Sequence, residues 1–71
     1  MNMNEITFLV QEAEEGGFWA RAMGKSIFTQ GETMEELKEN IKEVIQCFFD
    51  NEDMPTFAHL HFVKDEILEL A

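Results

Sequence analysis

The sequence has one cysteine and five basic residues among its 71 residues, and each scarcity excludes a class of protein. Cys47 has no partner for a disulfide within the chain, so the disulfide-rich secreted domains are excluded and a cytoplasmic location is expected. No apolar run is long enough to span a membrane, and no leader of charged and then apolar residues opens the sequence. We therefore expect no membrane association.

Basic residues are outnumbered by acidic ones, fifteen to five, which gives a net charge of −10. Binding of nucleic acid depends on Lys and Arg contacts to phosphates, so no direct binding of DNA or RNA is expected. No glycine-rich phosphate motif is present either. An acidic surface suits a basic protein partner, whose encounter it accelerates, although simple solubility explains the same charge.

Apolar residues make up 45% of the chain and include seven Phe and one Trp, which predicts a folded core. The length predicts a single domain over residues 1–71. At this size the burial of apolar surface barely offsets the conformational entropy lost on folding. We therefore expect a homo-oligomer, most simply a dimer.

The first part of the chain has the alternating pattern of β-strands. Ile6, Phe8 and Val10 alternate with less apolar residues, and the pair Gly16-Gly17 is typical of a hairpin turn. The pattern predicts a three-stranded antiparallel meander over residues 5–12, 18–23 and 26–30.

The second part predicts one helix from Met34 to Asp50 and a fourth strand from Thr56 to Val63. Thr33 and Glu36 have the spacing of a capping box, and Gly31 supplies the left-handed or otherwise open backbone that the preceding turn often needs. The helix has an apolar stripe of Met34, Leu37, Ile41, Val44, Ile45 and Phe48, which we expect to pack on the sheet. Two ion pairs are expected on its opposite face, Glu35 with Lys38 and Glu39 with Lys42.

A strand that follows a helix usually returns parallel, so the fourth strand is expected beside the first. The fold class is therefore α+β, with the order β-β-β-α-β and one helix on one face of the sheet. Residues 64–71 form a short C-terminal tail, for which a final helical turn and an interface arm are both open.

The order of elements, together with two short motifs, resembles the HicB-like antitoxins over about residues 5–50. The matching residues are Glu14, Glu15, Gly16, Gly17 and Phe18 in the hairpin, and Thr29, Gln30, Gly31, Glu32, Thr33, Glu35, Glu36, Leu37, Asn40, Ile41, Glu43 and Ile45 around the helix start. The resemblance implies a partial ribonuclease H-like fold without catalytic carboxylates. It also implies a non-catalytic protein that binds and occludes a basic, HicA-like, mRNA-cleaving toxin.

This chain is similar to a short, solitary type within that family. Only eight residues follow Val63, so the family's C-terminal DNA-binding segment is not expected here. The segment Ala22-Met23-Gly24-Lys25-Ser26 replaces the family's Pro-x-Leu-Pro-Gly turn. The alternative is therefore an orphan binding or regulatory module without a toxin. Short chains of this kind also carry the name 2-oxoisovalerate dehydrogenase beta subunit, whose cofactor domain does not fit in this length.

His59 and His61 are the strongest candidates for a metal site, because their side chains share one face of the predicted fourth strand. Cys47 is a possible third ligand. The alternatives are ordinary packing or surface roles and a response to pH. Asp50, Glu52 and Asp53 begin like a calcium loop but lack its glycine and distal glutamate.

No catalytic, cofactor-binding or metal-binding residue is assigned, and no cofactor is expected. The adjacent Glu14 and Glu15 point apart in an extended turn, which does not suit an acid and base pair. Cys47 has no neighbouring cation to activate it, so we expect a buried or bordering inert thiol.

Leu9, Trp19 and Met23 are expected to form an apolar surface if they lie away from the helix. With Phe49, which lies off the centre of the helix stripe, they favour a homodimer, because monomers seldom expose such patches. The alternative is that the tail residues Ile67, Leu68 and Leu70 fold back over this surface.

Overall fold

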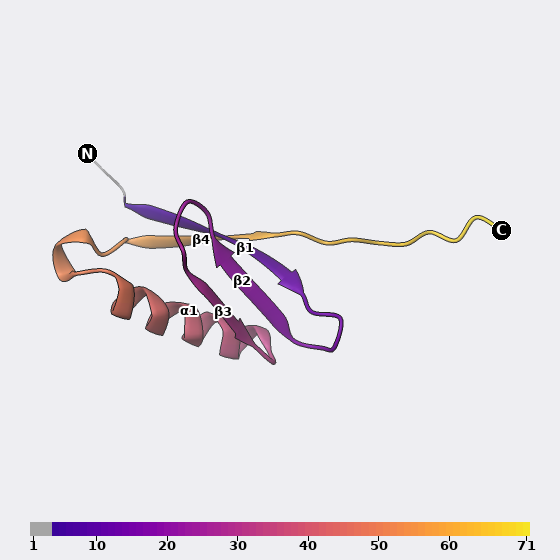
Figure 1. Ribbon diagram of the computed structural model, residues 1–71, viewed down its shortest axis with the longest axis horizontal. Helices are drawn as coiled ribbons and strands as arrows, with labels where there is room; N and C mark the ends of the chain where they lie inside the picture. The colour runs from indigo at the N-terminus through magenta and orange to yellow at the C-terminus, as the bar shows by residue number, and fades with distance from the viewer. Residues whose placement is uncertain (1–3) are drawn as a thin grey trace.

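The computed structural model describes residues 4–71 as one four-stranded sheet with one helix packed on one face (Figure 1). The elements in chain order are β1 (Glu5–Glu12), β2 (Phe18–Ala22), β3 (Phe28–Gly31), α1 (Met34–Phe48), the 3₁₀ turn η1 (Asn51–Asp53) and β4 (Phe57–Phe62). The sheet order is β3-β2-β1-β4. β1 pairs antiparallel with β2 and parallel with β4, and β2 pairs antiparallel with β3. The predicted meander and the parallel fourth strand are confirmed.

The predicted element boundaries need small corrections. β2 ends at Ala22 rather than at the predicted Met23, and β3 begins at Phe28 rather than Ser26. β4 is shorter than predicted by one residue at each end, since Thr56 and Val63 lie outside it. The β1–β2 connection turns at Gly16 and Gly17, whose φ angles are 104° and 82°. Both glycines therefore adopt the left-handed backbone that other residues avoid.

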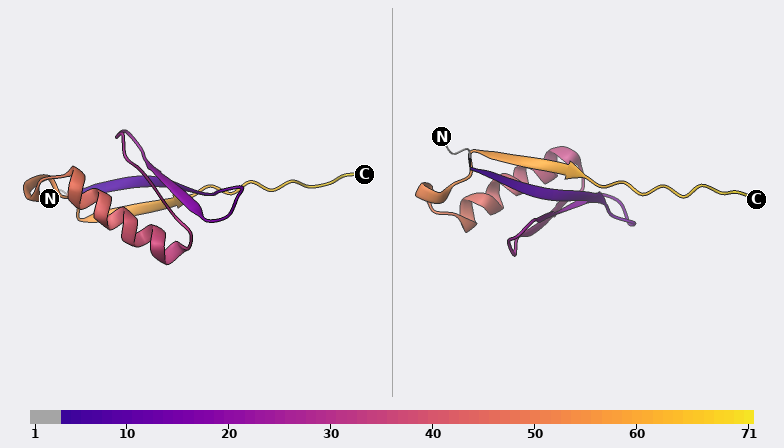
Figure 2. Two further views of the ribbon diagram at one scale, coloured as in Figure 1. Left: turned by 60° about the horizontal axis from the view of Figure 1, so that its bottom comes forward. Right: turned by 90° about the horizontal axis from the view of Figure 1, so that it is seen from above.

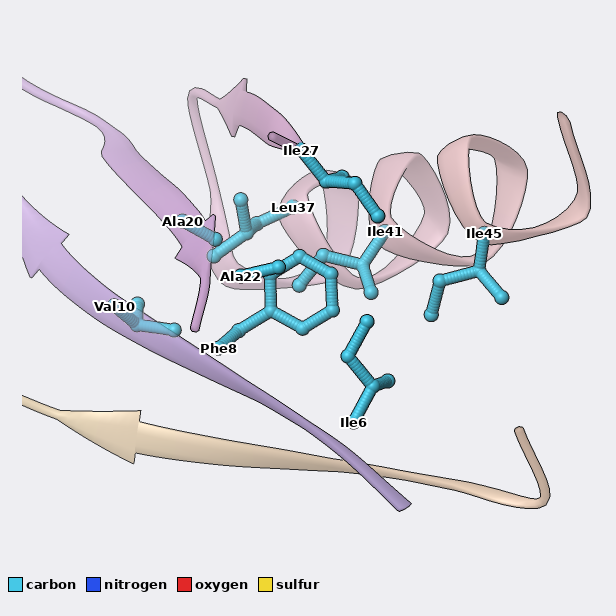
Figure 3. Close-up of a cluster of buried hydrophobic side chains, with 9 residues drawn as sticks. All are labelled: Ile6, Phe8, Val10, Ala20, Ala22, Ile27, Leu37, Ile41 and Ile45. Atoms are coloured by element: carbon cyan, nitrogen blue, oxygen red, sulfur yellow. The ribbon is translucent and has the colours of Figure 1, made fainter. Parts of the chain in front are cut away.

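The core lies between α1 and the inner face of the sheet. Figure 3 shows Leu37, Ile41 and Ile45 pointing from the helix toward the strands. They meet buried side chains from β1, β2 and the segment before β3: Ile6, Phe8, Val10, Ala20, Ala22 and Ile27. The predicted apolar stripe is confirmed for these three helix residues, because spacings of three or four place them on one face.

Gly31 has a different role from the one predicted. Its φ is not positive, so the turn does not need a left-handed residue there. Instead, a Cβ at this position would lie 2.5 Å from the backbone nitrogen of Leu37 and 2.8 Å from its Cα. Glycine is required because the first turns of α1 cross directly over the end of β3.

The start of α1 is capped as predicted, with one change of partner. The Thr33 hydroxyl oxygen accepts a hydrogen bond from the Glu36 backbone N–H at 3.0 Å. The Glu36 carboxylate accepts from the backbone N–H of Glu32, one residue before the position that a standard capping box uses. On the outer face of α1, the Glu39–Lys42 pair forms at 3.5 Å, whereas Glu35 and Lys38 do not pair in the described chain.

The end of α1 differs from the prediction. The helix stops at Phe48, two residues before Asp50, because Phe49 adopts an extended backbone with φ −110° and ψ 145°. This change of direction turns Phe49 toward the core and leaves Phe48 about half exposed, the reverse of what helical periodicity predicts. Lys25 lies over the Phe49 ring, with its Nζ 5.6 Å from the ring centroid.

The tail is neither a helical turn nor a cover for the sheet. Residues 63–71 have no regular secondary structure, and the chain runs straight on from β4 (Figures 1 and 2). Ile67, Leu68 and Leu70 are 96%, 77% and 89% exposed, so the fold-back alternative is wrong for this structure. Within residues 4–71, no helix combines the length and apolar character that crossing a membrane requires.

Candidate protein-interaction surfaces

The face of the sheet opposite α1 is open. Residues of β1 alternate, so Phe8 and Val10 face the helix while Thr7, Leu9 and Gln11 face outward. The register carries this alternation across the sheet and aligns one residue from each strand on the open face: Phe28, Arg21, Leu9 and His61. This surface is called the open face below.

Aromatic and sulfur-containing side chains gather on the β2–β3 side of the open face. The rings of Trp19 and Phe28 stack with their centroids 5.8 Å apart. Met23 and Phe28 are more than half exposed, and Leu9 and Trp19 are half-buried. Their arrangement agrees with the predicted apolar surface of Leu9, Trp19 and Met23. Phe49 packs against the core beyond the end of α1 and lines, together with Met23, a pocket of about 670 Å³.

Carboxylates flank the open face at the ends of β1. Glu14 and Glu15 lie just beyond the end of β1 in the β1–β2 connection, and Glu5 lies at its start. All three are exposed. Arg21 is the basic residue within the face itself. An apolar centre flanked by charged residues is the usual anatomy of a protein interface.

The two histidines lie on the open face of β4, as predicted from their spacing. Their ring centroids are 6.5 Å apart, and the Nδ1 atom of His59 lies 3.4 Å from a carboxylate oxygen of Glu5. Cys47 does not join them. It lies on α1 beside Thr29 and Val44, on the other side of the sheet.

None of the other predicted ligand sets is assembled. Throughout residues 4–71, no three His, Cys, Asp or Glu side chains come together as ligands of a metal ion would. Asp50 directly precedes η1 without a side-chain capping hydrogen bond, and Glu52 and Asp53 are exposed within that turn. Cys47 is exposed, so the prediction of a buried thiol is wrong and only the bordering position holds. Glu14 and Glu15 are exposed turn residues.

A second surface lies between α1 and β4, on the helix side of the sheet. α1 packs over β3 and β2 and leaves β4 largely uncovered. Between them is a groove of about 460 Å³, whose apolar lining includes Ile41, Ile45, Met54 and Leu60. Lys38 and Lys42 line the same groove from α1.

Sequence reasoning missed Phe28 and Phe57, both more than half exposed on the open face. The signal was available for Phe28, because a buried Ile27 places its neighbour on the opposite face of an extended segment. Phe57 shares the parity of His59 and His61 on β4. The groove had no such signal, since it depends on where the helix crosses the sheet.

These features define a class: a small α+β domain with one sheet face covered by a helix and the other open, aromatic and flanked by carboxylates. The chain belongs to the UPF0150 family. It is 49% identical over 61 residues to a UPF0150 protein of Thermotoga maritima, with 86% of each chain covered. It is 46% identical over 53 residues to a UPF0150 protein of Archaeoglobus fulgidus, which covers 75% of this chain and 79% of the relative. No family model and no solved structure matches the chain.

Proposed function

We propose that this chain is a non-catalytic, HicB-like antitoxin that binds and occludes a small basic ribonuclease of the HicA type. The observation that carries the proposal is the open face, where Trp19, Phe28 and Met23 are accessible and are flanked by carboxylates. The net charge of −10 supports a basic partner, because it attracts such a partner over long range.

The order of the elements is consistent with the partial ribonuclease H-like fold that the resemblance implies. A meander followed by a helix and a parallel edge strand is the observed arrangement. On this proposal the domain catalyses no reaction. It acts by binding its partner and blocking access to the partner's active site. A partner seated on the open face would exchange water for contact with the Trp19–Phe28 stack.

The same charge opposes direct contact with nucleic acid. Arg21 is the basic residue on the open face, and Lys38 and Lys42 line the groove on the other side of the sheet. Phosphate binding needs several cations on one surface. We therefore propose that the protein reaches RNA only through its partner. The exposed thiol of Cys47 suits a reducing cytoplasm, where we place the protein.

One observation favours the orphan module as a second candidate. The β2–β3 connection turns at Gly24, with φ 78°, and contains neither proline of the family turn. A chain whose toxin-facing turn has changed in this way would serve as a binding or regulatory module for another protein.

Co-expression separates the two candidates. The chain is produced together with a small basic ribonuclease of the HicA type, and RNA cleavage by that protein is measured with and without the chain. We expect cleavage to be suppressed, and suppression to weaken with salt. If that protein is inactive on RNA, or if its cleavage continues unchanged in the presence of the chain, the antitoxin proposal is wrong and the orphan module is favoured.

A further inference from the structure

β4 has one free edge. It pairs with β1 on one side only and is the last strand of the sheet. Its sequence, Phe57 to Phe62, contains no lysine, proline or carboxylate of the kind that usually blocks an exposed edge. The free backbone N–H and C=O groups of β4 are therefore available to another strand.

The chain that follows β4 is already extended and has nothing to pack against. The N–H of Val63 donates to the carbonyl of Val10 at 2.9 Å, which is the last backbone contact of the tail with the domain. Beyond it the tail runs on in line with β4 (Figures 1 and 2). Three large aliphatic side chains within four residues, Ile67, Leu68 and Leu70, are almost fully exposed. Apolar residues this close together mark a contact surface.

We propose that the tail of a second copy of this chain pairs antiparallel with β4, so that two chains exchange tails about a two-fold axis near Phe62. The two sheets then become one continuous sheet, and each tail covers the other chain's free edge. Closed two-fold pairing of this kind covers the free β4 edge of both chains at once. The inference is independent of the proposed function, because the pairing edge is separated from β2 by β1.

The register about Phe62 gives complementary neighbours on the open face. In an extended chain, odd-numbered tail residues continue the open face of Phe57 and His59. Antiparallel pairing about Phe62 places Ile67 of one chain beside Phe57 of the other, which is 54% exposed. The same register places Asp65 beside His59. Each side chain thus meets one of matching chemistry.

The same register fills the groove on the helix side. Even-numbered tail residues face α1, so Leu68 and Leu70 run on past the start of β4, toward the groove that Met54 and Thr56 line. Glu66 comes beside Ala58, which lines the same groove as Lys38 and Lys42. The apolar tail residues therefore match the apolar lining, and the carboxylate matches the lysines.

A second copy fits this edge better than the chain's own tail. To fold back onto its own β4, the tail would need a tight hairpin turn within Val63-Lys64-Asp65-Glu66. Two-residue hairpin turns favour positive φ angles, which glycine adopts most readily, and this segment contains no glycine. The straight path of the tail needs no turn.

Disulfide cross-linking tests the register. In a Cys47→Ser background, chains carrying His59→Cys are mixed with chains carrying Asp65→Cys and oxidised mildly. We expect a cross-linked pair from the mixture and none from either chain alone. The matched control replaces Asp65→Cys by Glu66→Cys, which points to the other face and should not cross-link. Equal cross-linking with both, or none with Asp65→Cys, would overturn the register.

Removal of the tail tests the dimer itself. Light scattering should give a dimer for the full chain and a monomer for a chain ending at Val63. The shortened chain should keep its far-ultraviolet circular dichroism per folded residue, because the removed residues lie outside the helix and strands. A monomeric full chain, or a shortened chain that is folded and still dimeric, would show that the tail does not join two copies.

Discussion

Gly31 determines how closely α1 approaches the sheet. The glycine lies at the end of β3, and the backbone of Leu37 crosses it at a distance that leaves no room for a Cβ. Backbone atoms cannot rotate away as a flexible side chain can. The helix must therefore move if the position gains a methyl group.

Replacement of Gly31 by alanine should destabilise the fold strongly. Overpacking against fixed backbone costs about 3 kcal/mol, which we expect to appear as a lower urea midpoint. The matched control is Gly24→Asn, because Gly24 has a positive φ, which asparagine tolerates, and no atom within 4 Å of a Cβ. If the Gly31→Ala variant had the same urea midpoint as the parent chain, α1 would not cross β3 as described.

Leu37 is the residue where the helix meets the core most completely. It is fully buried between α1 and the sheet. Leu37→Ala should cost about 2–5 kcal/mol of unfolding free energy through lost burial and the cavity left behind. The neighbouring Lys38→Ala, which is exposed, should change stability by less than about 0.5 kcal/mol. If urea denaturation gave similar losses of unfolding free energy for the two variants, Leu37 would not be a core residue.

At the scale of elements, α1 is the only helix of more than one turn in the described chain, and its first turn depends on a single cap. Thr33 accepts from the Glu36 N–H, and the carboxylate of Glu36 returns to the backbone of Glu32. Since the buried helix residues lie at the end of this turn or beyond it, loss of the cap weakens the packing of the whole element.

Thr33→Ala should lower the unfolding free energy by about 1 kcal/mol, because the Glu36 N–H loses its acceptor. Thr33→Ser keeps the hydroxyl and should retain most of the stability. Thermal unfolding followed by circular dichroism compares the two. Equal losses would show that the effect comes from the methyl group of the threonine rather than from the cap.

The elements that periodicity describes were predictable, and those that tertiary contacts decide were not. The alternation of Ile6, Phe8 and Val10 and the spacing of Leu37 and Ile41 each point to one buried face, and the structure agrees. Phe49 was placed off the centre of the helix stripe because periodicity assumes that the helix continues. The helix instead ends where the backbone extends.

The surfaces were predictable only in part. Strand parity places Trp19 and Met23 on one face with each other, but the sequence did not tell which face of the sheet the helix covers. The path of the tail and the groove beside β4 could not be predicted, because both depend on which strands the helix leaves uncovered. The role of Gly31 was missed for a related reason: a close approach between two elements leaves no mark in the sequence other than the glycine itself.

At the scale of the whole molecule, the charge of −10 on 71 residues is a source of self-repulsion. Raising NaCl from about 10 mM to about 150 mM shortens the Debye length from ~30 Å to ~8 Å and should raise the thermal midpoint. The variant Glu14→Lys/Glu15→Lys changes the charge from −10 to −6, since each reversal adds two, and should gain less from salt. A midpoint that falls with salt would show that attractive ion pairs dominate instead.

The proposed dimer and the proposed partner site are compatible. A two-fold axis perpendicular to the joined sheet places both helices on one side and both open faces on the other. Two partner molecules could then bind to one dimer, each near a Trp19–Phe28 stack. The dimer interface and the partner site would occupy different parts of this joined surface.

The fluorescence of Trp19 tests the account most directly, because it is the only tryptophan and lies on the open face. The chain is titrated with a small basic ribonuclease of the HicA type, freed of its own tryptophans if it has any. We predict a blue shift of the emission as Trp19 loses water, and affinity at least about thirtyfold lower for Phe28→Ala, as for a hot-spot residue. Binding without a change in Trp19 emission, or no binding at low salt, would contradict the assignment of the open face.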